Sequence, residues 1–204
     1  FSATIYRLLF RCRALPTRAA RLLLCTADAL AARGAAKSTQ HPKGNNMPDM
    51  LTSHSYEAIF IGQTAQYKKA VTEQDIQLFA AASGDVNPVH LDADFAARTP
   101  FGERIAHGML TGALISAALA LELPGPGTVY LSQTLEFLRP VKIGDAVTVQ
   151  LAVTGKHDRK RVITLDCIAV NDAGKTVAKG IAEVMAPANS DTLPRSTLPD
   201  ITVS

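Results

Sequence analysis

The sequence predicts an α+β domain in which an antiparallel β-sheet wraps around one long central helix. Three observations lead to this prediction. A short helical segment with capping residues comes first, and an apolar run of helical length follows at residues 105–123. The second half of the chain then alternates Val-, Thr- and Leu-rich segments with Gly, Pro and Asn turns, which is typical of consecutive antiparallel strands.

The first half of this domain is expected to be mainly helical. After a first strand near residues 65–70, Thr72 is the expected N-cap of a helix with acidic residues in its first turn. Gly84 ends this helix, and a turn-rich loop follows to Glu103, with one short helix expected at residues 92–97.

The apolar run at residues 105–123 is long enough to raise the question of a membrane span. It contains His107, several small residues and Glu122, and it stands alone among predicted strands. These features favour a buried central helix over a transmembrane one. Pro-Gly-Pro-Gly at residues 124–127 ends the helix.

The second half is expected to form the rest of the sheet. Strands are predicted at residues 129–137, 146–154, 161–170 and 175–185. The segment GKHDRK between the second and third of these indicates a hairpin, and Asn-Asp-Ala-Gly indicates the next turn.

Composition and charge restrict the function classes. The chain is 47% hydrophobic and has three Cys residues with no CxxC pair, which favours a packed core, a reducing compartment and no structural metal. Residues 1–46 contain eight of the 21 Lys and Arg residues against one acid, so this extension carries +7 and the remainder −4. A nucleic-acid-binding main domain is therefore not expected.

Four parts of the chain follow from these patterns. Residues 1–46 are a basic N-terminal extension, expected to be disordered, which is either a mitochondrial-type presequence or upstream sequence with the start at Met47 or Met50. Residues 47–64 are expected to be a linker and residues 188–204 a flexible tail, with the domain at 65–187 between them. A cytoplasmic location is expected, or a mitochondrial one if the presequence is genuine.

The motif SGDVNPVH at residues 83–90 is the first candidate for chemistry. Asn87 precedes a proline, which biases its backbone away from the helical region and keeps the segment extended. Asp85 and His90 could then face one cavity, where an acid and an imidazole share proton transfer. On spacing alone, an Asx turn at Asp85 with His90 on the surface remains the favoured interpretation.

The second candidate is the start of the long helix, Ala-His-Gly-Met at residues 106–109. A helix N-terminus presents unpaired N–H groups, and Gly108 would let a carbonyl oxygen approach the backbone closely. Close packing of this glycine on the sheet is an equally good interpretation. His107 fits a structural group better than a catalyst, and Ser116 fits a small packing residue better than a hydrogen-bond partner of Asp85.

The stretch FAAASGDVNPVHLDADFA at residues 79–96 resembles the signature of the MaoC-like (R)-specific enoyl-CoA hydratases, the hot-dog-fold hydratase 2 group. The segments IAHGMLTGALIS and FLRPVKIGDAV are also similar to this family, and the resemblance spans residues 66–187. The chain most resembles the short, single-domain hydratases of polyhydroxyalkanoate synthesis. The matching signature residues are Phe79, Ser83, Gly84, Asp85, Asn87, Pro88, Val89, His90, Asp92 and Phe95.

This resemblance implies a hot-dog fold, a homodimer, and hydration of a trans-2-enoyl-CoA thioester to the (R)-3-hydroxyacyl thioester without metal or other cofactor. It implies that Asp85 and His90 are the catalytic dyad and that Asn87 positions the water or the dyad. It further implies that the Gly108 amide is the oxyanion donor and that Ser116 supports the dyad. No chemical role is implied for His107, and neither nucleic acid nor membrane is an expected partner.

Three alternatives stay open at this stage. A dehydratase acting on acyl-carrier-protein thioesters would share the dyad and differ only in its carrier. Its basic docking patch would be Lys156, Arg159, Lys160 and Arg161, although a charged hairpin tip is usually just solvated. A hot-dog thioesterase is less favoured, because the full hydratase motif argues against it. A non-catalytic acyl-CoA-binding or dimerisation module is also less favoured, because a pure binder has no use for a proton-transfer pair.

Overall fold

The computed structural model describes residues 50–202 of the 204-residue chain. The predicted basic extension at residues 1–46 therefore lies outside the described residues, as does the start of the predicted linker. Within residues 50–202, no helix is long and apolar enough to cross a membrane.

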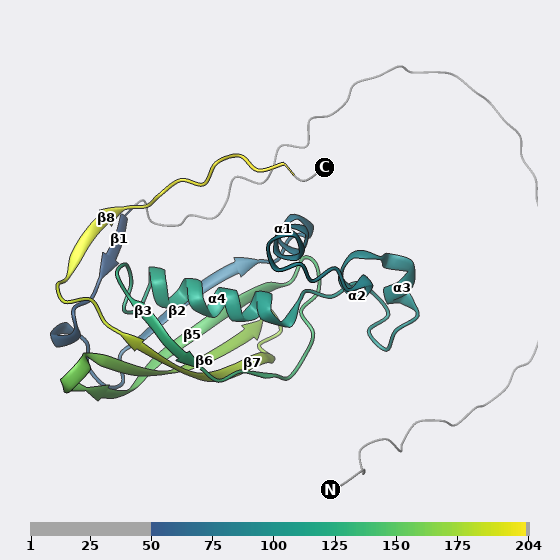
Figure 1. Ribbon diagram of the computed structural model, residues 1–204. Helices are drawn as coiled ribbons and strands as arrows, with labels where there is room; N and C mark the ends of the chain where they lie inside the picture. The colour runs from purple at the N-terminus through teal and green to yellow at the C-terminus, as the bar shows by residue number, and fades with distance from the viewer. Residues whose placement is uncertain (1–49, 203–204) are drawn as a thin grey trace, which may run out of the picture. The chain divides into compact units, whose positions relative to one another are not determined.

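The main sheet is antiparallel throughout, and its strands follow the order β2-β5-β6-β7-β3, with β4 also paired to β7 (Figure 1). The strands are β2 (Thr64–Ala70), β3 (Val129–Gln133), β4 (Glu136–Phe137), β5 (Ala146–His157), β6 (Val162–Asn171) and β7 (Thr176–Met185). Strands are found at all of the predicted places, but the one strand predicted at residues 129–137 is divided into β3 and β4, which both pair with β7. Strand β5 continues to His157, past its predicted end, because the hairpin keeps its pairing with β6 up to the short 3-10 turn η2 (Asp158–Lys160).

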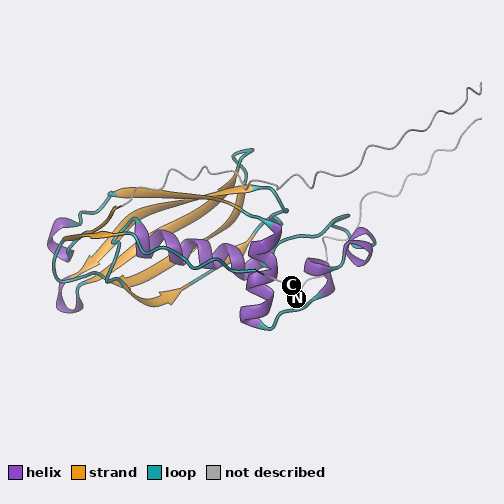
Figure 2. Cartoon of the chain, turned by 90° about the horizontal axis from the view of Figure 1, so that it is seen from above, coloured by secondary structure: helices purple, strands orange, loops and turns teal. Residues whose placement is uncertain are grey.

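The predicted central helix is α4 (Gly108–Leu121), which lies lengthwise across one face of the sheet (Figures 1 and 2). It starts later and ends earlier than the apolar run, because the backbone at His107 is extended and Glu122 is its C-cap, just before the Pro-Gly stop. The side that faces the sheet carries large aliphatic residues, including Leu114, Ile115 and Leu119, each at most 4% exposed. Burial on this face makes α4 the centre of the core.

The sheet residues that face α4 follow the two-residue period of a strand. In β5 these are Val147, Val149, Leu151 and Val153, and in β6 they are Ile163, Leu165, Cys167 and Ala169, all of them 0–2% exposed. Residues between them, such as Gln150, point to the opposite face. One long helix and one inner sheet face therefore build a single core, as the α+β hot-dog prediction requires.

Three short helices precede α4. Helix α1 (Glu73–Ser83) begins at the predicted N-cap, where Thr72 and Asp75 form a capping box, and it ends at Gly84 in the left-handed conformation (φ 76°). Helix α3 (Ala93–Ala97) confirms the predicted short helix and is capped by Asp92. Helix α2 (Pro88–Leu91) was not predicted. Together α2 and α3 lie beyond one end of the sheet (Figure 1).

The structure differs from the expected linker and tail. Strand β1 (Met50–Ser53) pairs with β8 (Asp191–Pro194), and the 3-10 turn η1 (Tyr56–Ala58) follows β1. The side chains of Tyr56 and Ile59 are 6% and 1% exposed and belong to the core. The linker was predicted from polar composition, whereas two isolated apolar residues and one ladder of backbone hydrogen bonds tie this segment to the fold.

Candidate active site

The loop that joins α1 to α2 is fixed by a chain of side-chain-to-backbone hydrogen bonds. The Ser83 hydroxyl accepts from the backbone N–H of Asp85 (3.2 Å), and the Asp85 carboxylate accepts from the N–H of Asn87 (3.2 Å). Asn87 in turn accepts from the N–H of Val89 (3.2 Å). Each of these contacts spans two residues, as in an Asx turn. The predicted Asx turn at Asp85 therefore exists, and it continues into the next structural element.

That element is α2, in which Pro88 occupies the first turn and Asn87 is the N-cap with extended backbone (φ −53°, ψ 125°). The one-turn helix carries His90 away from the surface, so that its side chain is 8% exposed. The surface position considered for His90 is therefore wrong. The Asn-Pro pair keeps the backbone extended at Asn87, as expected, and then starts a helix.

The orientation of His90 is set by a main-chain carbonyl. Its Nδ1 lies 2.8 Å from the carbonyl oxygen of Ile105, the second residue before His107. Because a carbonyl oxygen can only accept, Nδ1 must carry the proton of this hydrogen bond. In the neutral ring, Nε2 then holds the free lone pair, which is the form a general base needs.

The start of α4 lies against this loop. Nε2 of His107 is 2.9 Å from the backbone carbonyl oxygen of Asp85. The His107 ring stacks on the His90 ring, with the two ring centroids 3.8 Å apart. The ring centroid of Phe79 in α1 lies 5.0 Å from that of His107. One ring nitrogen or carboxylate oxygen from each of Asp85, His90 and His107 lies within 4.8 Å of the others. The fold thus brings both halves of the predicted site together.

A pocket of about 350 Å³ opens at this point, and the predicted residues His90 and Gly108 line it. Gly108 is the first residue of α4, where backbone N–H groups have no partner within the helix. A Cβ built on Gly108 would lie 3.5 Å from the ring of Phe137, in ordinary van der Waals contact, so a small side chain would fit here but would fill part of the space between this ring and the helix. The other lining residues include Phe101, Thr111, Phe137, Leu138 and Arg139.

Asp85, His90 and His107 are also the group among residues 50–202 whose donor atoms could suit a metal ion. A zinc ion needs ligand atoms about 2.0–2.2 Å from itself that converge on one point. Each histidine already binds a carbonyl through one ring nitrogen, so each could offer a metal only its other ring nitrogen, and the two ring planes are tilted by 34° to each other. The arrangement suits proton transfer better than coordination.

The structure does not bring every predicted residue to the pocket. Asp85 is exposed and is not a lining residue, although one of its carboxylate oxygens lies within 4.8 Å of a His90 ring nitrogen. Ser116 is half-buried near the middle of α4, about 12 Å along the helix from Gly108 at 1.5 Å per residue, and it does not line the pocket. Asn87 is exposed, and its side chain contacts the backbone at Val89. Sequence reasoning missed Arg139 and Phe137 as pocket residues, although both belong to or adjoin the FLRP segment that resembles the family.

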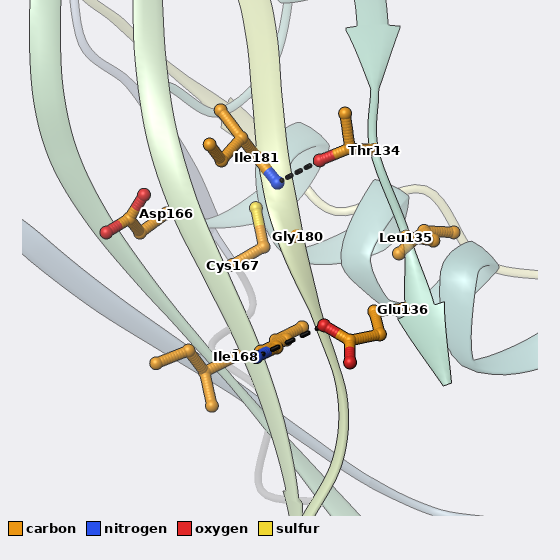
Figure 3. Close-up of a pocket in the computed structure, with 9 residues that line it drawn as sticks. Thr134, Leu135, Glu136, Asp166, Cys167, Ile168, Gly180 and Ile181 are labelled. Atoms are coloured by element: carbon orange, nitrogen blue, oxygen red, sulfur yellow. Dashed lines mark hydrogen bonds and ion pairs between the residues drawn. The ribbon is translucent and has the colours of Figure 1, made fainter. Parts of the chain in front are cut away.

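A second pocket, of about 430 Å³, lies between β6, β7 and the segment that joins β3 to β4 (Figure 3). Its polar contacts are an ion pair between Lys179 and Glu136 (3.1 Å) and a hydrogen bond from the N–H of Ile181 to Thr134 (2.9 Å). Burial raises the pKa of the Cys167 thiol to about 12, so this thiol stays protonated at neutral pH and is a poor nucleophile. We therefore assign the chemistry to the smaller pocket.

Comparison with known proteins agrees with this geometry. Residues 59–171 match the family model described as MaoC like domain. The chain is 47% identical over 140 residues to an (R)-specific enoyl-CoA hydratase of Rhodospirillum rubrum, covering 69% of this chain and 96% of that protein.

Two solved structures extend the match to the whole fold. The unliganded R-hydratase PhaJ1 from Pseudomonas aeruginosa is 50% identical, with a TM-score of 0.73 over 76% of this chain and 99% of that one. An (R)-hydratase from A. caviae involved in PHA biosynthesis is 40% identical, with a TM-score of 0.62 over 64% and 99% of the two chains. The predicted hot-dog fold is confirmed, and the chain belongs to the MaoC-like domain family.

Proposed function

We propose that this protein is an (R)-specific enoyl-CoA hydratase, a hydro-lyase that adds water reversibly to trans-2-enoyl-CoA and forms (R)-3-hydroxyacyl-CoA. One observation carries the proposal: His90 lines a pocket whose wall includes the N-terminus of α4, and a carboxylate oxygen of the exposed Asp85 lies within 4.8 Å of a His90 ring nitrogen. The names of the relatives support it, since they are (R)-hydratases. A role in supplying polyhydroxyalkanoate synthesis follows from the A. caviae relative.

The chemistry can be assigned to individual groups. The Nε2 lone pair of His90 takes a proton from water while the water oxygen bonds to C3 of the enoyl chain, and the Asp85 carboxylate accepts the second water proton in a hydrogen bond that orients it. The electrons of the C2–C3 double bond move to the thioester oxygen, where the Gly108 N–H stabilises the charge. The enolate then collapses, and C2 takes back the proton held on His90.

Asn87 and Ser116 have supporting roles in this proposal. Asn87 caps α2 and accepts from Val89, so it holds the turn between the two dyad residues. Ser116 stands further along α4, and its support of the dyad rests on the family resemblance alone. Addition of oxygen and proton from one side of the substrate follows if a single imidazole both removes and returns the proton, which gives syn hydration.

The test is the loss of ultraviolet absorbance of crotonyl-CoA, with chiral analysis of the product. We expect only the (R) product from the wild-type protein. Asp85→Asn and His90→Gln should each lower kcat by about 100- to 10,000-fold, because proton transfer by a positioned group contributes that much. The matched controls Asp94→Asn and His157→Gln change exposed residues outside the pocket and should keep the wild-type rate. Wild-type rates in either dyad variant would contradict the proposal.

The carrier of the acyl group is the point on which the main alternative differs. The patch considered for an acyl-carrier protein was Lys156, Arg159, Lys160 and Arg161. Lys156 is not free for this purpose, since its ammonium binds the backbone carbonyls of Tyr56 (2.7 Å) and Ile59 and lies 4.3 Å from the centre of the Tyr56 ring. We propose coenzyme A as the carrier. Comparison of kcat/KM for C4 to C12 enoyl-CoAs and one acyl-carrier-protein thioester tests this choice.

The other two alternatives separate by product. A thioesterase would release free coenzyme A, which a thiol reagent detects, and a binding module would retain the substrate unchanged. Neither outcome is expected, because the dyad places a base and a carboxylate where water can add to C3.

A homodimer is part of the proposal. Strand β3 is the edge of the main sheet, and its residues Val129, Tyr130 and Leu131 are 46%, 38% and 50% exposed. An exposed apolar edge strand pairs readily with another chain unless something covers it, and a second copy offers the same edge in antiparallel orientation. Light scattering during gel filtration should give twice the monomer mass, and Leu131→Lys should shift it toward the monomer.

The compartment is also a proposal. We propose a cytoplasmic enzyme, and the mitochondrial alternative depends on residues 1–46, which lie outside the described residues. The full chain with a fluorescent protein at its C-terminus would separate the two, because a functional presequence would carry the fusion into mitochondria.

A further inference from the structure

His107 is buried and has two contacts that packing alone does not explain. Its side chain is 2% exposed, its Nε2 lies 2.9 Å from the Asp85 carbonyl oxygen, and its ring stacks on His90 at 3.8 Å. Two different parts of the proposed dyad, the main chain of Asp85 and the ring of His90, therefore meet on this one side chain.

The hydrogen bond to Asp85 determines the proton position on His107. The carbonyl oxygen only accepts, so Nε2 must be the protonated nitrogen. Nδ1 is buried and has no hydrogen-bond partner among the described residues. A second proton on Nδ1 would be a buried donor without an acceptor, beside a stacked imidazole that must itself take up a proton. The geometry thus selects the Nε2–H tautomer of His107.

The unpaired Nδ1 argues against a purely space-filling role. A buried polar atom without a partner costs free energy, and a phenyl ring would fill nearly the same volume without that cost. The Nε2–H group is the one feature of His107 that a phenyl ring cannot supply. It fixes the Asp85 carbonyl, and with it the peptide plane from which the Asp85 side chain extends into the loop.

We propose that His107 is a positioning residue for the dyad. Its Nε2–H anchors the main chain at Asp85 while its ring supports the face of His90, so that carboxylate and imidazole stay within proton-transfer reach. This inference rests on the proposed hydratase function. His107 also lines the pocket, but the inference gives it no proton to transfer: it acts through Asp85 and His90.

Two substitutions separate the hydrogen bond from the ring. His107→Phe keeps an aromatic ring beside His90 and removes the donor, whereas His107→Gln keeps an N–H donor at the position of Nε2 and removes the ring. A catalytic group misplaced by about 1 Å costs about 100-fold in rate. We expect His107→Phe to lower kcat about 100-fold with KM within threefold of wild type, and His107→Gln to recover at least tenfold of that loss.

Thermal unfolding of both variants provides the structural readout. His107→Phe removes a buried unpaired nitrogen, so we expect its unfolding temperature to stay within a few degrees of wild type while its kcat falls. A kcat for His107→Phe within twofold of wild type would overturn the proposal. Equal loss of kcat in both variants would overturn the assignment of Nε2–H as the anchoring group.

Nitrogen-15 spectroscopy of the imidazoles tests the same inference without turnover. In the wild-type protein at neutral pH, His107 should show a protonated Nε2 and an unprotonated Nδ1, and His90 should show the opposite tautomer. A His107 ring protonated on Nδ1 contradicts the inference even in an active enzyme. A wild-type protein that fails to hydrate any enoyl-CoA overturns the proposed function instead, so the two failures are distinguishable.

Discussion

The sheet with its central helix and the segment from Gly84 to Gly108 are built on different principles. In β5, β6 and β7 the backbone groups pair with neighbouring strands, and the inner side chains are aliphatic and almost completely buried. In the segment 84–108, side chains such as Asp85, Asn87 and Asp92 supply the acceptors for backbone N–H groups. The first region gains stability from apolar burial, and the second gains a defined shape from local polar contacts.

This difference predicts that stability and activity can be changed separately. A deletion in the sheet should lower the free energy of unfolding and leave the turnover of the folded protein intact. A change in the polar segment should lower the turnover and leave the free energy of unfolding nearly unchanged, as proposed for the dyad. Three substitutions in or beside the scaffold test the first half of this statement, in order of expected effect.

Leu165→Ala should give the largest loss of stability. Leu165 of β6 is 0% exposed and belongs to the core that faces α4. A buried Leu→Ala change costs about 2–5 kcal/mol, because transfer energy is lost and a cavity remains. Urea unfolding measures the loss, and kcat at low temperature should stay near wild type. Ile168→Ala, at a 40% exposed position on the same strand, is the control and should cost about 0.5 kcal/mol or less.

Gly180→Ala should have the next largest effect. The segment between β3 and β4 crosses so close to Gly180 of β7 that an added Cβ would collide with the carbonyl oxygen of Thr134. Backbone must move to admit the methyl group, which costs about 1–3 kcal/mol. Gly155→Ala is the matched control, since its Cβ would meet only the Thr164 side chain, at 3.3 Å. Equal loss in both variants would show that the crossing is not tight.

Thr72→Ala should cost about 1 kcal/mol, because it removes the N-cap of α1. Thr72→Ser keeps the capping hydroxyl and should restore most of the loss. Burial would raise the pKa of the capping partner Asp75, but hydrogen bonds from Lys69 and from Thr72 outweigh it and hold the pKa below its ordinary value. The stabilisation from Asp75 is therefore present at neutral pH and is lost as pH falls through the lowered pKa. Urea unfolding of the variants at pH 7 checks the effect of the cap, and unfolding of the wild-type protein between pH 7 and 3 checks the contribution of Asp75.

The elements that could be predicted from sequence are those with local signals. Thr72 and Gly84 mark α1 by capping chemistry, and the alternation of Val147, Val149 and Leu151 marks an inner strand face. The β1–β8 pair escaped prediction, because its partners lie about 140 residues apart and neither carries a strong pattern. Pairing over such a distance depends on where the rest of the chain has already placed both ends.

The candidate site was predicted in a similar, partial way. His90 and Gly108 line one pocket, and a carboxylate oxygen of Asp85 lies within 4.8 Å of a His90 ring nitrogen, although Asp85 is exposed and does not line the pocket. Spacing alone favoured a surface turn, since it could not show that α2 turns His90 inward. The contacts of His107 and the position of Arg139 in the pocket wall depend on how elements far apart in the sequence pack together. A short sequence motif carries no information about such packing.

Both histidines of the pocket are oriented by main-chain carbonyls, those of Ile105 and Asp85, and within residues 50–202 neither ring has a hydrogen bond to an acidic side chain. A carbonyl is present whatever amino acid occupies its position. No single substitution at Ile105 or Asp85 can delete the acceptor that selects each tautomer, so only a shift of the backbone can exchange the protonated nitrogens. The proton arrangement of the pocket should therefore tolerate change in the neighbouring side chains and respond to insertions or deletions in the segment between α1 and α4.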